Sequence, residues 1–340
     1  MTRTIRVYTA AAASLTALFS TTQAGAHCFV GSRFFPATLA VDDPCVADEL
    51  SLPTISVLKN GDDPSARQLD ISGEFSKRIT DDVGISIGSA FTRLRVPGGP
   101  SASGWQNLET TLKYQFLTDP EAEFVMSAGL SVEWGKTGNP SVGAEKFNVL
   151  TPTVWFGKGF GDLVPDTLSW ARAFGVTGQF GYAVPTWPRT VTVAGFDPDS
   201  GFDFDVEHNP RFLVWGGTLH YNFRYLQSNV VDIGLPDFAA RLIPIVEARF
   251  VTPLANRETS GFTTRGTVNP GVIWVGNYFQ IGAEAIIPIN RKSGRDIGWL
   301  AQLHFYLDDI FPRSVGRPII PGVLPTTIGR PTAVSYEGGR

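Results

Sequence analysis

Charged and hydrogen-bonding side chains recur at alternate positions in many segments between residues 67 and 307, with apolar residues between them. Such side chains can line a path and select solutes, or they can pair with one another across a narrow interior. The ionisable groups that we expect in this interior are Asp70, Glu74, Glu109, Lys113, Glu123, His220, Arg224, Arg241, Glu247, Arg249, Glu284 and His304. Acids and bases both occur, so a packed interior and a solute path are equally supported.

Hydrolysis is the main alternative chemistry that these residues offer. A nucleophile needs a base within reach and a third group that holds the base. Beyond residue 27 there are three histidines, His208, His220 and His304, and none has a serine two residues further on. The zinc-protease pattern His-Glu-x-x-His is also missing from the sequence. We therefore expect no enzyme, and we keep a hydrolase that uses His220 or His304 as an alternative.

Acidic residues crowd the segment from Phe196 to His208. They are Asp197, Asp199, Asp203, Asp205 and Glu207. Oxygen ligands at this density can hold calcium, but Gly201 precedes Asp203 instead of following a run of ligands, so the consensus loop is missing. Solvated loop charge explains the segment better than a metal site. We expect neither a metal nor a cofactor.

The two cysteines, Cys28 and Cys45, both precede the first expected strand. In an oxidising compartment such a pair is expected to form a disulfide. Closing a loop of about 16 residues stabilises a fold by about 3 kcal/mol. The alternative is a metal site with His27, but two sulfurs and one imidazole fall short of a closed structural zinc set.

The elements that position these groups show a period of two, most clearly from Asn107 to Phe116. Leu108, Leu112 and Tyr114 fall on one face of this segment, while Glu109 and Lys113 fall on the other. A period of two is the mark of a β-strand whose faces meet different environments. The expected strands reach about ten to thirteen residues, against about five or six in ordinary globular proteins, which suits a strand tilted across a bilayer.

Twelve such strands can be proposed. They cover residues 49–58, 67–79, 83–95, 105–117, 122–134, 148–158, 172–184, 211–226, 240–252, 267–275, 278–289 and 297–307. Short turns follow the second, fourth and tenth strands, and long polar connections fall between the turns. Bacterial outer-membrane barrels keep short turns on the periplasmic side and long loops outside. With a periplasmic N-terminus, the long polar loops all fall on the outer side, and two periplasmic connections, 159–171 and 227–239, are longer than usual. The fold class is therefore all-β, an antiparallel transmembrane barrel of about twelve strands.

Aromatic residues are expected in two rows, because amphipathic rings favour the headgroup zones of a membrane. The row toward the outer side is Phe91, Trp105, Trp134, Tyr182, Trp215, Phe250 and Trp299. The row toward the periplasm is Phe75, Phe116, Trp155, Phe174, Phe223, Trp274 and Phe305. The competing explanation is that aromatic residues are simply common in strands.

The ends of the chain complete the expected domains. Residues 1–26 resemble a secretory signal, with Arg3 and Arg6 before a short apolar core and a small-residue cleavage site ending near Ala26. Residues 27–48 form a periplasmic N-terminal segment that packs below the barrel or in its lumen, and the barrel covers 49–307. Residues 308–340 form a proline-rich tail, expected to be extended on the periplasmic side or folded back as a plug.

The charge composition limits the classes of molecule that this chain is expected to bind. The formal net charge is −4, which leaves no basic stripe for nucleic acid. The expected location is the outer membrane of a Gram-negative bacterium. The expected partners there are membrane lipid and lipopolysaccharide, the barrel-assembly machinery and a small solute. A soluble exported β-sandwich would also alternate apolar and polar positions, but it leaves the strand length and loop asymmetry unexplained.

Two segments resemble a family of bacterial outer-membrane proteins associated with the meta-pathway of phenol degradation. One runs from Leu108 to Phe116 and the other from Leu130 to Asn139, where an inward-polar strand meets Lys136-Thr137-Gly138. Together they cover less than a tenth of the chain. The resemblance implies a porin-like transporter of small solutes, hydrophobic or aromatic ones among them. A non-conducting structural or adhesion barrel and an outer-membrane hydrolase are the alternatives.

Overall fold

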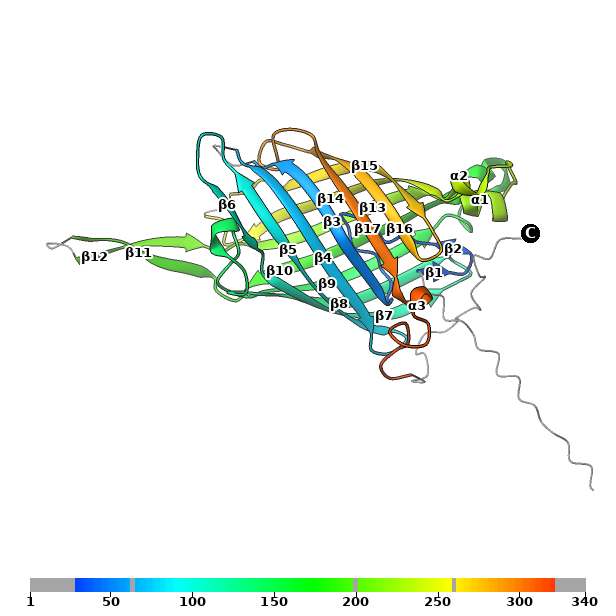
Figure 1. Cartoon of the computed structure of the whole chain (residues 1–340), viewed down its shortest axis with the longest axis horizontal. Helices are drawn as coiled ribbons and strands as arrows, with labels where there is room; N and C mark the ends of the chain where they lie inside the picture. The colour runs from blue at the N-terminus through cyan, green and yellow to red at the C-terminus, as the bar shows by residue number, and fades with distance from the viewer. Residues whose placement is uncertain (1–27, 62–64, 198–200, 259–260, 322–340) are drawn as a thin grey trace, which may run out of the picture.

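A closed β-barrel forms the body of the molecule (Figure 1). The computed structural model describes residues 28–61, 65–197, 201–258 and 261–321. The strands of the wall are β3 (Glu49–Lys59), β4 (Arg67–Arg78), β5 (Val83–Arg95), β7 (Leu108–Asp119), β8 (Phe124–Trp134), β9 (Val149–Gly159), β10 (Phe174–Pro185), β13 (Arg211–Tyr221), β14 (Leu242–Ala255), β15 (Arg265–Val275), β16 (Phe279–Pro288) and β17 (Gly298–Tyr306). Neighbouring strands are antiparallel, and β17 pairs with β3 to close the ring. The predicted twelve-stranded barrel is confirmed.

The expected alternation holds along the wall, with large apolar side chains on the outside. In β16, Gln280 is fully buried whereas its neighbour Ile281 is 51% exposed. In β7, Leu112 and Tyr114 are exposed, while Thr111 is buried in the interior. Apolar surface outside and polar groups inside is the distribution of a transmembrane barrel, because hydrocarbon covers the outer face. No helix in the described part of the chain is long and apolar enough to span a membrane.

Short turns gather at one end of the barrel and long loops at the other, as predicted, and two longer connections, 160–173 and 222–241, lie at the end with the short turns. One end, here called the turn end, carries the short turns 79–82, 120–123 and 276–278. It also carries η2 (Asp166–Ala173), α1 (Phe223–Asn229) and α2 (Asp237–Ala240). The opposite loop end carries β6 (Ser101–Trp105), which pairs with β5, and η1 (Pro140–Val142). From the loop end a hairpin of β11 (Arg189–Asp197) and β12 (Gly201–His208) extends away from the barrel (Figure 1).

Aromatic rings cluster near both ends of the wall. The ring centres of Trp215 and Phe250 lie 4.4 Å apart toward the loop end, and those of Phe174 and Tyr221 lie 4.8 Å apart at the turn end. Two expected members of the turn-end row are placed differently. Trp155 points into the interior and is buried, because Phe156 takes the outward position in β9, and Phe223 belongs to α1.

The expected strand over 211–226 is too long, since β13 ends at Tyr221. The side chain of Asn222 accepts a hydrogen bond from the backbone N–H of Tyr225, which is the N-cap arrangement that starts α1. The segment 185–210, expected to be a loop, contains the β11–β12 hairpin. Its alternating residues, Thr-Val-Thr-Val and Phe-Asp-Phe-Asp-Val-Glu, already carry the period of a strand.

Residues 28–48 form what we call the N-terminal plug. The plug begins with a small hairpin of β1 (Phe29–Val30) and β2 (Arg33–Phe34) and continues as irregular chain. Phe34 packs in a buried cluster with the inward-facing residues Ile243, Ile245, Ile273, Val275 and Tyr306. Of the two placements that the sequence left open, these contacts are those of a segment inside the lumen.

The plug is closed on itself by the predicted disulfide between Cys28 and Cys45, whose Cα atoms are 5.5 Å apart. This disulfide is confirmed, and it takes both sulfurs away from the alternative metal site. His27, the third ligand of that alternative, lies outside the described residues. Cys28 packs with Val30, Phe35 and Val125, so the bond is part of a buried apolar cluster.

The chain leaves the barrel through α3 (Leu307–Ile310) and follows the turn end as far as residue 321. The backbone N–H groups of Ile319 and Ile320 donate to the carbonyls of Arg78 and Ile79 at the end of β4. The first part of the predicted tail is therefore docked at the turn end. The rest, residues 322–340, and the predicted signal over 1–26 lie outside the described residues.

Candidate functional site

One buried carboxylate fixes the plug to the wall. Glu247 of β14 is fully buried, and its oxygens accept hydrogen bonds of 2.7 Å from the backbone N–H groups of Leu39, Ala40 and Val41. Successive N–H groups that converge on one anion form strong, charge-assisted hydrogen bonds. The sequence predicted Glu247 as an inward charge, and the structure shows that its partner is the plug backbone.

Three amide and hydroxyl side chains of the wall hold the rest of the plug, and none of them was among the predicted site residues. Gln280 donates to the carbonyl of Ala37, Ser127 donates to the carbonyl of Pro44, and Gln115 accepts from the N–H of Val46 at 3.0 Å. Gly282 makes room for the plug, because a Cβ there would lie 2.6 Å from a methyl carbon of Leu39. Alternation placed these residues inside, but only the path of the plug gives them partners.

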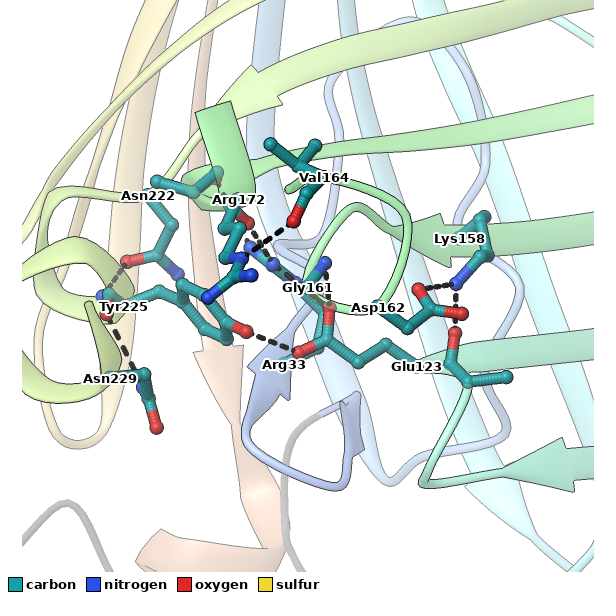
Figure 2. A network of polar contacts seen from close by, with 12 residues as sticks. Arg33, Glu123, Lys158, Gly161, Asp162, Val164, Arg172, Asn222, Tyr225 and Asn229 are labelled. Carbon is teal, nitrogen blue, oxygen red and sulfur yellow. Dashed lines mark hydrogen bonds and ion pairs between the residues drawn. The ribbon is translucent and has the colours of Figure 1, made fainter. Parts of the chain in front are cut away.

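A buried ion pair anchors the first turn of the plug at the turn end (Figure 2). The guanidinium of Arg33 donates to the Glu123 carboxylate from Nε at 3.0 Å and from an Nη at 2.9 Å, and it lies 3.6 Å from the ring centre of Tyr225. The hydroxyl of Tyr225 donates to the same carboxylate at 2.6 Å. Burial, followed by the Glu123 contact, raises the pKa of Tyr225 to about 12, so this hydroxyl stays a donor.

Glu123 occupies an unusual backbone position in the β7–β8 turn, with φ at +48°. The left-handed region is costly for a residue with a Cβ, and it persists where the surroundings hold it. Arg33, Tyr225 and the N–H of Gly161 all bond its carboxylate. Glu123 was expected to face the lumen; the structure makes it the anchor of the plug hairpin.

A second ionic cluster joins the start of the barrel to its C-terminal extension. Asp48 is fully buried and accepts from Lys77 at 2.6 Å and from Arg78 Nε at 2.8 Å. Arg78 also lies 3.5 Å from Asp308 of α3 and donates to the carbonyl of Gly316. Burial raises the pKa of Asp308 to about 8, against the partial opposition of Arg78, so this carboxyl holds its proton at neutral pH.

Between the plug and the wall lies a cavity of about 610 Å³. Its lining comes from plug residues 37–47 and from strands β3 to β5, β7 to β10, β13, β14 and β17. The charged groups of the lining are Asp42, Asp43, Glu49, Glu74, Glu109, Glu133, Lys113 and Arg249, with His304 beside them. Six acidic side chains and two permanent cations, Lys113 and Arg249, therefore share this lining.

Lys113 bridges the wall and the plug inside this cavity. Its ammonium donates to the Asp42 carboxylate and to the carbonyl of Asp43, both at 2.8 Å, and lies 4.7 Å from the Trp155 ring centre. A lysine that contacts two acidic plug residues and an aromatic face is held tightly. The acid-rich cavity therefore uses one of its two permanent cations to fix the plug.

Five of the expected interior residues line the cavity: Glu74, Glu109, Lys113, Arg249 and His304. Five others have partners elsewhere in the barrel interior. Asp70 accepts from Thr92 at 2.6 Å, Glu284 accepts from Asn269 at 3.2 Å, His220 packs edge-on against Phe35, and Glu123 and Glu247 hold the plug. The interior is thus partly packed and partly hollow, as the mixed charge pattern allowed.

The structure corrects the expectation for Arg224 and Arg241. Arg224 belongs to α1 and pairs with Asp237 at 3.7 Å. Arg241 precedes β14 and donates to Asp237 at 2.6 Å and to Asn277 at 2.8 Å. Both arginines support the helical connection at the turn end instead of lining the lumen, because β13 ends at Tyr221, before Arg224, and β14 begins at Leu242, after Arg241.

Several lining residues were missed by the sequence analysis. Glu49 is the first residue of β3, and Glu133, near the end of β8, accepts from Asn107 at 2.8 Å. Their positions alternate with outward residues, so the strand period was a usable signal. No such signal exists for Asp42 and Asp43, because the plug there has no regular structure.

One cross-strand contact in the cavity wall has the composition of a hydrolytic triad. The hydroxyl of Ser51 lies 2.8 Å from His304 Nδ1, and the Glu49 carboxylate lies 3.4 Å from His304 Nε2. All three residues line the cavity. By contrast, Gly84-Ile85-Ser86-Ile87-Gly88 has the letters of a nucleophile elbow but lies inside the regular strand β5, without the strand–turn–helix bend that an elbow needs.

Comparison with known proteins supports the fold. The COG4313 outer membrane channel from Pseudomonas putida F1 has a TM-score of 0.50 and 11% identity, over 80% of this chain and 99% of that one. The β domain of the Bordetella autotransporter BrkA has a TM-score of 0.45 and 11% identity, over 76% of this chain and 98% of that one. The KdgM porin has a TM-score of 0.41 and 11% identity, over 74% of this chain and 98% of that one.

The likeness to the COG4313 channel, at 11% identity, shows a shared barrel fold and nothing finer. No family model matches the chain, and no curated protein matches it. The resemblance to the meta-pathway phenol-degradation family therefore stays a prediction. The structure and the likeness to that channel together make the chain a β-barrel of the outer-membrane type.

Proposed function

We propose that this chain is a porin-like transporter in the outer membrane of a Gram-negative bacterium, reached after signal cleavage near Ala26. The closed wall with an apolar exterior supports the membrane location. In that location its partners are outer-membrane lipid and lipopolysaccharide, the barrel-assembly machinery and a small solute. The polar cavity supports transport over a purely structural role, because a structural barrel has no need of a hollow lumen.

The acid-rich lining of the cavity is the observation that supports a particular class of transported solute. Six carboxylic acids face Lys113 and Arg249 across a space large enough for a small molecule. Rings of acidic side chains select cations in channels. We therefore propose small cationic or polar solutes. The hydrophobic or aromatic solutes implied by the family resemblance have less support, because the lining is mostly polar.

The N-terminal plug acts as the gate in this proposal. Its contacts with Glu247, Gln280 and Lys113 place it across the lumen beside β14 to β16 and beside β7. The disulfide and the Arg33–Glu123 pair fix its base. Solute passage then requires the middle of the plug, around residues 37–44, to move away from the wall while its base stays anchored.

Planar-bilayer recordings test transport and selectivity. In a gradient of potassium chloride, we expect wild-type protein to conduct and the reversal potential to show preference for potassium. Replacing Glu74, Glu109 and Glu133 by glutamine should reduce that preference. The matched control is Glu121→Gln, Asp166→Asn and Asp296→Asn, which removes the same charge from outside the cavity. A correctly assembled barrel that never conducts would instead identify a structural or adhesion barrel.

An outer-membrane hydrolase is the second candidate, and the Ser51–His304–Glu49 contact is its support. In that reaction the Ser51 oxygen attacks an ester carbonyl carbon, and its proton passes through His304 to the departing alcohol. Water then attacks the acyl-serine and restores the hydroxyl while the carboxylic acid leaves. Hydrolysis of nitrophenyl esters that is lost in Ser51→Ala and His304→Gln, but kept in Ser56→Ala, would establish it.

A further inference from the structure

The β11–β12 hairpin is a separate two-stranded sheet that projects from the loop end (Figure 1). Its base is held firmly. Asn209 donates to the carbonyl of Trp187 at 3.1 Å and to the hydroxyl of Thr190 at 3.0 Å, and Asn256 donates to the carbonyl of Asn209 at 2.7 Å. A fixed base presents the rest of the hairpin in one orientation. Neither the cavity nor the plug includes any residue of this hairpin.

The two faces of the hairpin differ sharply. One face carries Val191, Val193, Phe202, Phe204 and Val206, which are between 42 and 62% exposed. The pairs Val191–Val206 and Val193–Phe204 lie directly opposite each other across the two strands. The other face carries Thr190, Thr192, Asp203, Asp205 and Glu207. An isolated hairpin is marginally stable in water, and a contiguous exposed apolar face of this kind marks an interaction site.

Asp203, Asp205 and Glu207 of the polar face belong to β12, and the residues directly opposite these three acids in β11 are neutral. Thr192 is paired with Asp205, and Thr190 with Glu207. Within the described residues, no strand pairs with the outer edge of β12. An open edge offers its N–H and C=O groups to another strand. A strand added there would place every second side chain directly beside Asp203, Asp205 and Glu207.

We propose that the outer edge of β12 binds an extended peptide segment of another protein in which apolar and basic residues alternate. The added strand continues the apolar face with its apolar residues and sets lysine or arginine beside the three acids. Strand addition supplies backbone hydrogen bonds, and opposite charges on neighbouring strands stabilise the pairing. Because the hairpin lies at the loop end, this binding is independent of the solute path.

Charge argues against the other occupants. Anionic lipid headgroups are repelled by the acidic face of β12. A second copy of this chain could add its β12 antiparallel to the first β12. In the registers that keep the apolar residues of both strands on one face, acids of one strand then lie directly opposite acids of the other. Like charges in that position destabilise a sheet. A segment of alternating apolar and basic residues can hydrogen-bond the open edge of β12, extend the apolar face and pair its basic side chains with the three acids.

The test uses full-length protein in detergent and a fluorescent nine-residue peptide of alternating valine and lysine. Fluorescence anisotropy at about 0.15 M salt should show saturable binding. Replacing Asp203 and Asp205 by asparagine and Glu207 by glutamine should weaken binding about tenfold, since three favourable cross-strand charge pairs are lost. The variant Glu121→Gln, Asp166→Asn, Asp296→Asn removes the same charge elsewhere and should bind as wild type does.

Two altered peptides separate strand addition from simple charge attraction. A peptide N-methylated at alternate residues keeps its charge but loses backbone donors, and it should not bind. A peptide with the same residues in separate blocks should bind wild type and the triple variant equally weakly. Equal binding of all three peptides would overturn the proposal. So would hairpin-dependent dimers in chemical crosslinking, or binding to anionic vesicles that survives loss of the three acids.

Discussion

Three consecutive backbone N–H groups of the plug depend on the single carboxylate of Glu247. An ionised acceptor strengthens each bond, and loss of a hydrogen bond to a charged group costs about 1.5–3 kcal/mol. No other side chain of the described wall contacts the plug backbone at three successive residues. The residue therefore decides how easily the middle of the plug leaves the wall.

Replacing Glu247 by glutamine should loosen the plug without removing its volume. The amide offers one neutral acceptor oxygen in place of two charged ones, so amide hydrogen exchange at residues 39–41 should accelerate about tenfold to a hundredfold. Mass spectrometry of peptides from this segment measures the change. Glu133→Gln is the matched control, since Glu133 bonds Asn107 and not the plug. Unchanged exchange in Glu247→Gln would contradict the role given to this carboxylate.

Residues of the site that follow the strand period were predictable, and those of the plug were not. Glu74, Glu109 and Lys113 face inward because they alternate with apolar neighbours along β4 and β7. Asp42 and Asp43 complete the same cavity from irregular chain, where no period connects a residue to a face. The hydrogen-bond partners of the inward residues could not be predicted either. Alternation indicates that Glu247 points inward, but it does not indicate that the carboxylate bonds the plug backbone.

At the scale of elements, the buried carboxyl of Asp308 ties α3 to the barrel end through Arg78. Its pKa is raised from 3.8 to about 8, chiefly by burial, so the folded state holds a proton that the free carboxyl gives up near pH 4. A raised acid pKa means that the folded state binds more protons, and stability falls as pH rises between about 4 and 8. The docking of α3 and of residues 311–321 should weaken over that window.

Hydrogen exchange at Ile319 and Ile320, whose amides bond the end of β4, reports this docking. After correction for the intrinsic pH dependence of exchange, protection should decline from pH 5 to pH 8 in wild type. Asp308→Asn removes the titration and should flatten the profile, while the neighbouring Asp309→Asn should keep the slope. A wild-type profile that is already flat would show that Asp308 does not govern the docking.

The Cys28–Cys45 disulfide joins the start of the plug to a position near its end, so it constrains the whole plug and not a single contact. A closed loop of this size contributes about 3 kcal/mol by restricting the unfolded chain. The double variant Cys28→Ser, Cys45→Ser should therefore raise the open probability in bilayer recordings. A reductant should raise wild-type conductance to the same level and leave the double variant unchanged. Equal conductance with and without reductant in wild type would exclude the disulfide as a constraint on the gate.

Element boundaries were predicted well where the chain stays in the wall and poorly where it leaves. β5 spans the expected residues, whereas the strand expected over 211–226 stops at Tyr221. Asn222 continues the alternation of polar residues, yet its side chain caps a helix, and period alone does not separate these two outcomes. The β11–β12 hairpin was overlooked because length and acidity suggested a loop, although its residues alternate.

In the molecule as a whole, the plug, which we propose to be the gate, is also part of the core of the barrel. Phe34 fills the interior at the turn end and packs against Ile243, Ile245 and Ile273. This contact explains why these inward-facing residues are apolar in an otherwise polar lumen. Burying one large apolar side chain contributes about 1.5–3 kcal/mol. The N-terminal segment therefore stabilises the turn end of the barrel, and in the proposed gating mechanism stability and closure depend on the same residues.

Removal of residues 28–47 should accordingly change both properties at once. The shortened protein should still form a barrel, because the ring of strands closes between β17 and β3 without the plug. It should unfold at lower urea concentration than wild type in a gel assay of heat-modifiable mobility, since Phe34 and Arg33 no longer fill the turn end. Its conductance should rise while potassium preference persists, because Glu74, Glu109 and Glu133 belong to the wall. A shortened barrel that assembles but conducts no better than wild type would show that another part of the chain closes the lumen.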